Sequence, residues 1–188
     1  MPRFTRAELQ SFRGTEVPDL LGTDVRLLFV GINPGLWTAA TQTHFAHPVN
    51  RFYPALLRAG IIGHPIDPSA GMTDEDRDLL RGRGIGITNL VRRATARADE
   101  LSRDELREGG RQLEELVHRV APRVVAVAGI TAYRHAFGHR GAALGHQPEP
   151  FAGAELWVVP NPSGLNAHET VESLAAAYAE PARAAGIL

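Results

Sequence analysis

Four short apolar runs recur along the chain and predict strands. They lie at residues 25–32, 85–90, 124–128 and 156–159, and they are rich in Val, Ile and Leu. Such runs are typical of strands that are buried on both faces of a parallel sheet. Because helix-forming segments alternate with them, we predict an α/β fold. Its form would be a three-layer α/β/α sandwich around a small, mainly parallel four-stranded sheet.

The segments between these runs carry helix signals. Thr5 to Glu8 and Ser102 to Glu105 have the capping-box pattern, which predicts helices ending near residues 12 and 120. Gly109-Gly110 inside the second helix costs about 1 kcal/mol per Gly relative to Ala, which close packing on a strand or fraying would explain. Further helices are expected at residues 50–59 with Asn50 as cap, 73–81, 131–137, and 167–180, where Pro181 ends or kinks the helix. Residues 37–49 and 63–71 are expected to be loops.

Chain length and net charge exclude fewer functions than the pattern of apolar and polar residues does. The 188 residues fit one domain, residues 1–188. The net charge is -1, so a nucleic-acid-binding face would have to be a local patch. With no signal-peptide pattern and no membrane-length apolar run, we expect a cytoplasmic protein that does not bind membranes.

The chain contains no Cys and no Lys. The absence of Cys excludes disulfides, thiol nucleophiles and cysteine-held iron–sulfur clusters. The absence of Lys leaves no side-chain amine for Schiff-base chemistry and removes the lysine of a phosphate-loop NTPase. Codon bias in a GC-rich genome is an alternative reason for the exclusive use of Arg, but the chemical consequence is the same.

Two Asn-Pro turns follow the first and last predicted strands. Asn33-Pro34-Gly35 comes after the run ending at Gly31, and Asn161-Pro162-Ser163-Gly164 comes after Val159. Pro fixes its own φ, and a following Gly can take φ > 0, so both segments predict tight turns. They place an Asn at the carboxyl end of a strand, where open α/β sheets hold their sites. A plain structural turn is the alternative for each segment taken alone.

Together with the segment between them, these turns carry a family resemblance. The motifs Gly31–Leu36, Phe45-Ala46-His47-Pro48, Asn50-Arg51-Phe52 and Asn161–Leu165 occur in the order of the mismatch-specific uracil/thymine-DNA glycosylase family, part of the uracil-DNA glycosylase superfamily. The resemblance extends from about residue 25 to about residue 178. It implies an α/β/α sandwich, base flipping and duplex DNA with a G·U or related mismatch as the partner. It implies no cofactor, and we expect a monomer.

The resemblance also assigns roles in the pyrimidine pocket. Asn33 would position the attacking water, and backbone N–H groups around Ile32, Gly35 and Phe45 would receive the charge left on the base. Phe45 would be the platform for the flipped base, with a core Phe as the alternative. The remaining pocket residues would be Asn89 lining the pyrimidine site, Asn161 touching the base, and Thr38 against its C5 side unless it is a solvated loop residue.

The second turn resembles the wedge that fills the gap left by a flipped base. Ser163, Gly164 and Leu165 would form it, although a turn whose Leu caps the last helix is the alternative. Relatives often carry Arg just after this Leu, where the present chain has Asn166, which weakens backbone anchoring. Relatives also carry an acidic residue after the second strand, where this chain has Arg92-Arg93. These arginines could contact phosphates together with Arg97, or form a solvated charge run.

Other candidate chemistry is weak. The pairs His44/His47 and His135/His139 have helical spacings, but no third ligand is evident, so we expect no metal site. The resemblance therefore implies a monofunctional DNA glycosylase that removes uracil, and related pyrimidines, from mismatches with guanine. The alternatives are a DNA-damage binder or weakly active paralogue on the same fold, and a small-molecule α/β hydrolase. The absence of a Ser elbow, a Cys nucleophile and a phosphate loop argues against the hydrolase.

Overall fold

A single sheet forms the centre of the computed structural model, which describes residues 4–188, and its strand order is β2-β1-β3-β5-β4. The strands are β1 (Leu27–Gly31), β2 (Ile85–Asn89), β3 (Val124–Ala128), β4 (Gly145–His146) and β5 (Glu155–Val159). All neighbours pair in parallel except β4 and β5, which are antiparallel. The predicted α/β fold is confirmed, but the four-strand prediction was wrong. The extra strand, β4, has two residues in a Gly-rich loop and is too short to produce a periodic signal.

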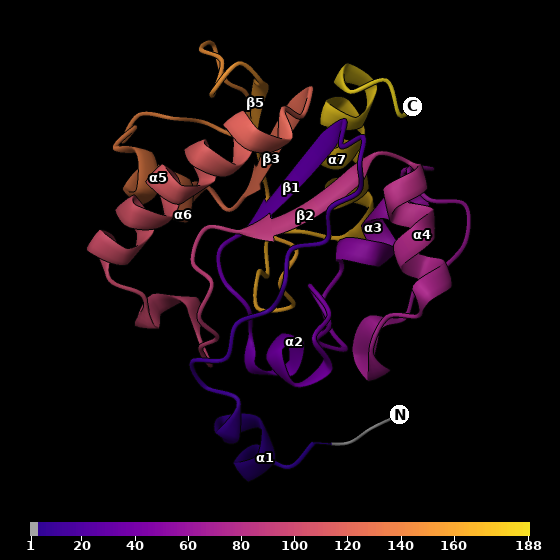
Figure 1. Cartoon of the computed structure of the whole chain (residues 1–188), viewed down its shortest axis with the longest axis vertical. Coiled ribbons are helices and arrows are strands. Elements are labelled where there is room, and N and C mark those ends of the chain that lie inside the picture. Colours follow the sequence, from indigo (N-terminus) through magenta and orange to yellow (C-terminus); the bar gives the residue numbers. More distant parts are fainter. Residues whose placement is uncertain (1–3) are drawn as a thin grey trace.

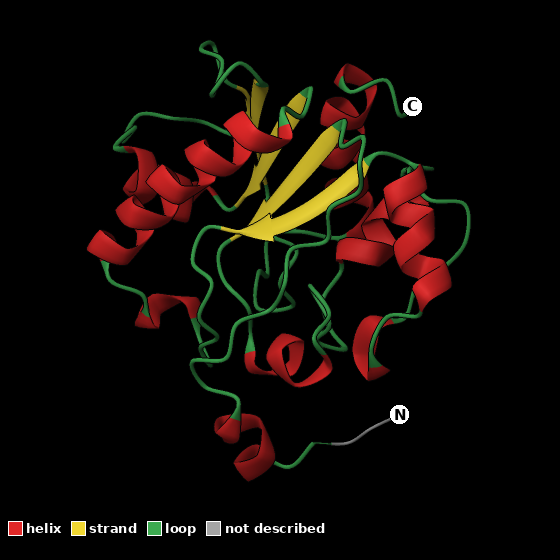
Figure 2. Ribbon diagram, in the orientation of Figure 1, coloured by secondary structure: helices red, strands yellow, loops and turns green. Residues whose placement is uncertain are grey.

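Helices cover both faces of the sheet (Figures 1 and 2). Along β1, Leu27 and Phe29 belong to one buried cluster, whereas Leu28 and Val30 belong to the other. This is the alternation expected of a strand that is buried on both sides. The first cluster includes side chains of α3 (Phe52–Arg58), α4 (Asp74–Gly82) and α7 (Val171–Ala184), and the second includes side chains of α5 (Arg103–Val120) and α6 (Ile130–Phe137).

The Gly pair in α5 is explained by close packing. A Cβ on Gly109 would lie 2.2 Å from the carbonyl oxygen of Leu90, directly after β2. A Cβ on Gly110 would lie 3.0 Å from the carbonyl oxygen of Ala136 in α6. The pair therefore brings α5 against β2 and α6 at distances that a larger residue would prevent. Of the two explanations given for its cost, close packing is the one that the structure supports.

The segment expected as a loop at residues 37–49 contains a helix, α2 (Leu36–Thr41), so that prediction was wrong. Its side chains make tertiary contacts that its short, polar sequence does not reveal. Leu36 is buried, and the indole N–H of Trp37 donates to the carbonyl of Ser69 at 2.9 Å. Figure 1 shows α2 beyond the carboxyl ends of the strands, below the sheet.

Three other boundaries differ from expectation. Arg51, not Asn50, is the N-cap of α3, and Asn50 instead accepts the N–H of Phe52. The last helix begins at Val171 because Thr170 forms a capping box, and Pro181 lies inside it without ending it. Burial of Pro181 and of the turn after it offsets the missing hydrogen bond.

The remaining short elements are α1 (Arg6–Ser11), η1 (Pro68–Ala70) and η2 (Ala98–Glu100). The capping box predicted at Thr5 and Glu8 is present. Across residues 4–188, every helix is too short or too polar to span a lipid bilayer.

Candidate functional site

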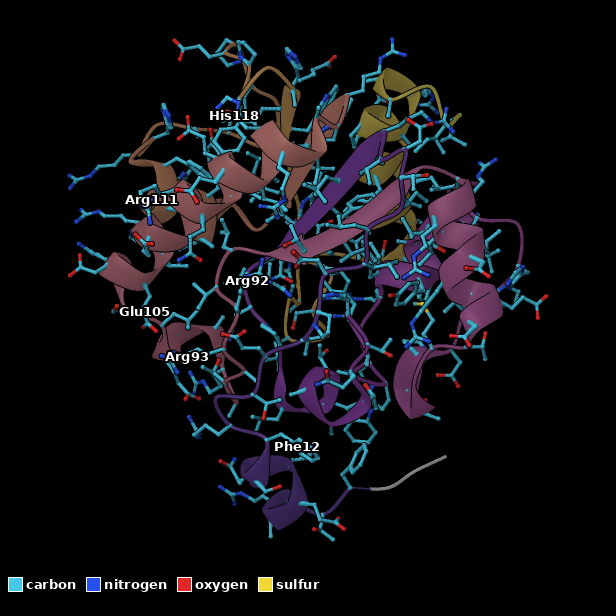
Figure 3. The ribbon with its side chains drawn as sticks, viewed as in Figure 1. Phe12, Arg92, Arg93, Glu105, Arg111 and His118 are labelled. Carbon is cyan, nitrogen blue, oxygen red and sulfur yellow. The ribbon has the colours of Figure 1, made fainter. Side chains whose placement is uncertain are left out.

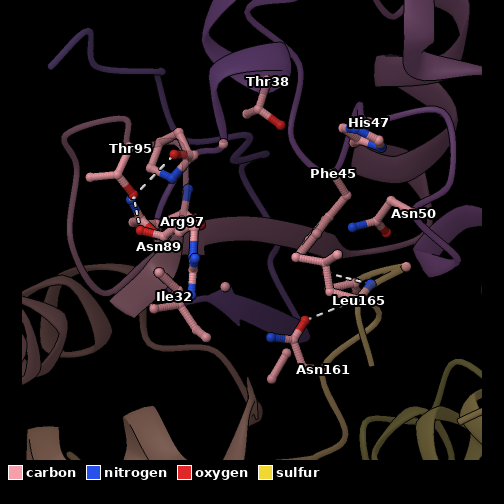
Figure 4. Close-up of a pocket in the computed structure, with 18 of the residues that line it drawn as sticks. Ile32, Thr38, Phe45, His47, Asn50, Asn89, Thr95, Arg97, Asn161 and Leu165 are labelled. Atoms are coloured by element: carbon pink, nitrogen blue, oxygen red, sulfur yellow. Dashed lines mark hydrogen bonds between the residues drawn. The ribbon is translucent and has the colours of Figure 1, made fainter. Parts of the chain in front are cut away.

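An open cleft of about 520 Å³ lies at the carboxyl ends of the parallel strands. It gathers the loops that follow β1, β2 and β5, together with Ala128 at the end of β3, as expected for an open α/β sheet. The sequence-predicted residues that line it are Ile32, Asn33, Gly35, Thr38, Phe45, Asn89, Asn161, Ser163, Gly164, Leu165 and Asn166. Arg92 and Arg93 are not part of the lining. Figure 4 shows Phe45 and Leu165 on one side of the cleft and Asn89 and Thr95 on the other.

The amide of Asn33 has a fixed orientation. Its Nδ2 donates to the carbonyl of Arg93 at 3.0 Å and to Thr95 Oγ1 at 2.8 Å. The Thr95 hydroxyl in turn donates to the carbonyl of Arg97 at 2.7 Å, so its oxygen must accept from Asn33. Among the described residues, no donor is paired with Asn33 Oδ1. The arrangement therefore leaves one amide oxygen available to a water or a ligand in the cleft.

The floor of the cleft is a glycine between an aromatic ring and an amide. A Cβ on Gly31 would lie 2.5 Å from Asn89 Oδ1 and 3.3 Å from Phe45 Cζ. Phe45 stacks on the buried ring of Phe52, with centroids 4.1 Å apart and an interplanar angle of 27°. Its φ of 56° is strained for a residue with a side chain, at a cost on the order of 1–3 kcal/mol. Phe45 is thus neither a fully buried core residue nor free to move.

The side chain of Asn89 contacts a buried histidine, His44. His44 is 6% exposed, its Nε2 lies 2.8 Å from the carbonyl of Pro18, and its Nδ1 lies 3.2 Å from Asn89 Nδ2. Burial lowers the pKa of His44 below its usual value, which the contact with Pro18 offsets in part. Tyr53 secures the same segment by donating its hydroxyl to the carbonyl of His44 at 3.0 Å.

Thr38 lies in α2 and is 6% exposed, so it is not a solvated loop residue. Its Oγ1 accepts the N–H of Ala46 at 3.2 Å. This bond ties α2 to the segment that carries Phe45. Thr38 therefore lines the cleft with its hydroxyl already engaged.

The loop after β5 is braced by its own side chains. Asn161 Oδ1 accepts the N–H of Ser163 at 3.0 Å, and Ser163 Oγ accepts the N–H of Leu165 at 3.2 Å. Asn166 Nδ2 donates back to the carbonyl of Asn161 at 3.1 Å. Leu165 is 87% exposed at the tip, so it does not cap the last helix. Gly164 is required here because a Cβ would lie 2.4 Å from Val49 Cγ2.

Arg51 holds this loop from beneath. Its guanidinium donates to the carbonyls of Ser163 at 2.6 Å, Asn166 at 2.7 Å and Glu169. Its backbone N–H donates to the carbonyl of Pro162 at 3.0 Å. The Nε is buried without a hydrogen-bond partner among the described residues. The guanidinium therefore places a positive group beneath the loop.

The two arginines after β2 form ion pairs. Arg92 contacts Asp19 at 3.0 Å, and Arg93 contacts Glu105 at 2.5 Å. Figure 3 labels Arg92, Arg93 and Glu105. The hydrogen bond from Arg93 lowers the pKa of Glu105 to about 2. Both side chains are paired and still partly exposed to solvent, 41% for Arg92 and 38% for Arg93. Arg97 does line the cleft, where it pairs with the exposed carboxylate of Asp99.

The sequence analysis did not predict the supporting roles of Thr95, His44 and Arg51, whose hydrogen bonds hold Asn33, Asn89 and the loop after β5. Thr95 gave no signal, because it is an isolated Thr whose partner, Asn33, lies 62 residues away. The only sequence signal at His44 was its spacing to His47, which is that of a possible metal-binding pair. Within the described part of the chain, no group of three or more His, Asp and Glu side chains is arranged to hold a metal ion.

Comparisons with known proteins show which fold and which family this chain matches. A solution NMR structure from Methanosarcina acetivorans, described as a candidate uracil DNA glycosylase, superposes with a TM-score of 0.60. The match covers 89% of this chain and 96% of that chain at 19% identity, which supports the same fold. The family model of the Uracil DNA glycosylase superfamily matches residues 18–181, which include the whole cleft lining. The chain therefore belongs to the uracil DNA glycosylase superfamily.

Proposed function

We propose that this protein is a monofunctional, mismatch-specific DNA glycosylase that removes uracil opposite guanine from duplex DNA and so starts base excision repair. Membership of the superfamily supports DNA as the substrate. The observation that carries the proposal is the orientation of Asn33. Its nitrogen donates to Thr95 Oγ1 and to the carbonyls of Arg93 and Pro34, while its oxygen is left for a water in the cleft that also holds Phe45.

The cleft is suited to a base that has left the helical stack. A glycosylase must extrude its target nucleotide, because the N-glycosidic bond is hidden within the duplex. The exposed part of the Phe45 ring offers a stacking surface, and such stacking contributes about 1–3 kcal/mol per base. Leu165, at the tip of the neighbouring loop, would fill the vacated space beside the orphaned guanine.

We expect the glycosidic bond to lengthen before the water attacks the sugar. The bond between the sugar C1′ and the base N1 breaks, both electrons stay with the base, and the sugar gains oxocarbenium character. Backbone N–H groups of Ile32, Gly35 and Phe45 supply donors for the charge on the pyrimidine. A water on Asn33 Oδ1 adds to C1′ and loses its proton to solvent or to the departing base. An amide is too weak a base to take that proton, so Asn33 acts through position.

The chain has no lysine, so no side-chain amine can form an imine with the abasic sugar. Hydrolysis should therefore be the whole reaction, and the product should be an intact strand with an abasic site.

The test is single-turnover excision from end-labelled DNA carrying G·U, A·U or G·T pairs, or uracil in a single strand. We expect the fastest excision from G·U, strand breaks only after alkali treatment, and no covalent complex after borohydride reduction. Efficient trapping by borohydride would contradict hydrolysis. Tight binding to G·U duplex without excision would favour the DNA-damage binder.

A further inference from the structure

We propose that Val49 is a second wedge residue, which packs against the base pair beside the gap in an opened duplex while Leu165 fills the gap itself. This inference rests on the proposed function, because it concerns how the same cleft holds DNA from which a base has been extruded. Three observations carry it: both side chains are exposed, both line the cleft, and their loops contact each other.

Val49 and Leu165 form an exposed apolar pair at the cleft. Val49 is 59% exposed and Leu165 is 87% exposed. The other large apolar side chains that are exposed in residues 4–188 lie outside the cleft lining: Leu57, Leu144 and Leu188. Single exposed apolar residues are common, whereas a group of them beside a cleft indicates a contact surface. The pair therefore marks a place where the protein meets an apolar part of its ligand.

The two side chains come from distant parts of the chain that meet at Gly164. A Cβ on Gly164 would lie 2.4 Å from Val49 Cγ2 and 2.8 Å from the carbonyl oxygen of Val49. Val49 therefore packs directly against the residue that precedes Leu165. Figure 4 shows Asn50, the residue after Val49, on the same side of the cleft as Leu165. A base stack that receives Leu165 would for this reason also meet Val49.

Hydrogen bonds hold the Val49 segment and the Leu165 loop together. The N–H of Val49 donates to Nδ1 of His47 at 3.3 Å, and the N–H of Asn50 donates to the carbonyl of His47 at 2.8 Å. Two residues after Val49, Arg51 binds the Leu165 loop through its backbone N–H and its guanidinium. Valine is also branched at Cβ, which restricts its rotamers and limits the entropy lost when it is covered. The pair is therefore positioned before DNA arrives.

The occupant that fits this pair is the base stack beside an extruded nucleotide. Extrusion leaves a gap in the stack, and an apolar side chain inserted there unstacks and kinks the neighbouring step. The kink exposes apolar surface of the adjacent base pair to water. Leu165, at the tip of its loop, can enter the gap, whereas the shorter Val49 lies beside it and can cover that newly exposed surface. Burial of this surface favours the opened duplex over the stacked one.

The first measurement compares single-turnover excision of uracil opposite guanine in a duplex with excision from a bubble of unpaired bases in the same sequence. Val49→Thr keeps the branched shape that contacts Gly164 but replaces a methyl group with a hydroxyl. We expect the duplex rate to fall about three- to tenfold, while the bubble rate stays close to wild type. Val49→Ile keeps the apolar surface and should retain the duplex rate. Leu144→Thr, exposed outside the cleft, is the control and should change neither rate.

The second measurement requires binding but no excision. 2-Aminopurine, placed on either side of the uracil in separate duplexes, becomes brighter when it is unstacked. In the Asn33→Ala background at saturating protein, Val49→Thr should reduce this increase on one side of the uracil and leave the other side unchanged. In the Leu165→Ala background, Val49→Thr should lower the duplex excision rate by a smaller factor than in wild type, because the gap beside it is no longer filled.

The outcomes are distinguishable. If Val49→Thr slows excision from duplex and bubble equally, or slows neither, Val49 only packs against Gly164 and the inference is wrong, while the proposed function stands. If Val49→Thr instead changes the oligomeric state in size-exclusion chromatography, the apolar pair joins two copies of this chain, which also overturns the inference. If the wild-type protein excises uracil from neither DNA, the proposed function is wrong, and the 2-aminopurine signal still decides whether Val49 contacts an opened duplex.

Discussion

The turn after β1 and the turn after β5 both begin with Asn-Pro and end with Gly-Leu. In the first turn, Leu36 is 8% exposed and packs beside Val17, Ala39 and Ala94. In the second turn, Leu165 is 87% exposed. The two Asn side chains differ in the same way. Asn33 is held by the neighbouring loop through Thr95, whereas Asn161 accepts a hydrogen bond within its own turn.

The difference lies in what surrounds each turn. The first is enclosed by α2 and by the loop after β2, which together bury its Leu and orient its Asn toward the cleft. The second turn, from Ser163 to Asn166, is held mainly by the Arg51 guanidinium, which contacts only carbonyl oxygens of the loop. A similar sequence therefore serves a rigid site in one place and a projecting apolar tip in the other. Reaction geometry needs the first arrangement, and insertion between bases needs the second.

The largest loss of excision rate is expected from a substitution of Asn33. In Asn33→Ala no side-chain oxygen remains to hold the water, so the single-turnover rate on G·U duplex should fall on the order of 10² or more. Binding to the same duplex, measured by fluorescence anisotropy, should stay close to wild type because the Leu165 loop is unchanged. The matched variant Asn161→Ala removes only an internal brace and should lose much less. Near wild-type cleavage by Asn33→Ala would refute its assignment as the water ligand.

The two leucines give a second, smaller contrast. Burial of Leu165 between bases would contribute roughly 1.5–3 kcal/mol. Leu165→Ala should therefore lower excision from G·U duplex about tenfold, while excision from single-stranded DNA changes little. Product release should become faster because nothing fills the gap opposite guanine.

Leu36→Ala is the matched control for that experiment. It removes a buried side chain, so it should lower the free energy of unfolding by about 2–5 kcal/mol and leave the duplex-to-single-strand ratio unchanged. Thermal denaturation of both variants checks the assignment. If Leu165→Ala is the less stable one and its excision follows the folded fraction, Leu165 is a structural residue.

A substitution of Arg51 tests whether the exposed turn depends on the hydrogen bonds that the guanidinium donates to it. Arg51→Met keeps the length of the side chain but removes every donor to Ser163, Asn166 and Glu169. We expect excision from duplex to fall roughly three- to tenfold, equivalent to one or two net hydrogen bonds. Arg58→Met, on the exposed side of the same helix, should have no effect. A loop that stays ordered in Arg51→Met, judged by unchanged proteolysis near residue 165, would show that the brace is dispensable.

Much of the sheet could be predicted from the sequence, because its parallel strands are apolar runs with little ambiguity. The run at residues 124–128 coincides with β3, and residues 85–90 differ from β2 by one residue. α2 and β4 could not be predicted in this way. They are short, and tertiary contacts such as that of Trp37 with Ser69 hold α2 in place.

The candidate site also has a part that could be predicted from the sequence and a part that could not. The order of the motifs predicted Asn33, Phe45 and the Leu165 loop as site residues, and all of them line one cleft. The residues that orient them are isolated polar side chains in other loops. His44 lies 45 residues from Asn89, and nothing in local spacing connects the two. Hydrogen bonds between distant loops become visible only when the sheet has brought those loops together.

The smallest expected effect concerns the support of Asn33. Thr95 is 1% exposed and accepts from Asn33 Nδ2 while donating to the carbonyl of Arg97. Thr95→Val keeps the shape but removes the hydroxyl, so the amide of Asn33 keeps the carbonyl of Arg93 as its main acceptor. One bond can still hold the nitrogen, and we therefore expect a loss of roughly three- to fivefold in the single-turnover rate, within the range of one net hydrogen bond.

Thr95→Ser retains the hydroxyl and should recover most of that rate. In the Asn33→Ala background, Thr95→Val should have no further effect, because there is no amide left to orient. If Thr95→Val instead slows Asn33→Ala by the same factor, the hydroxyl acts on the reaction by another route, and the rigid turn after β1 does not depend on it.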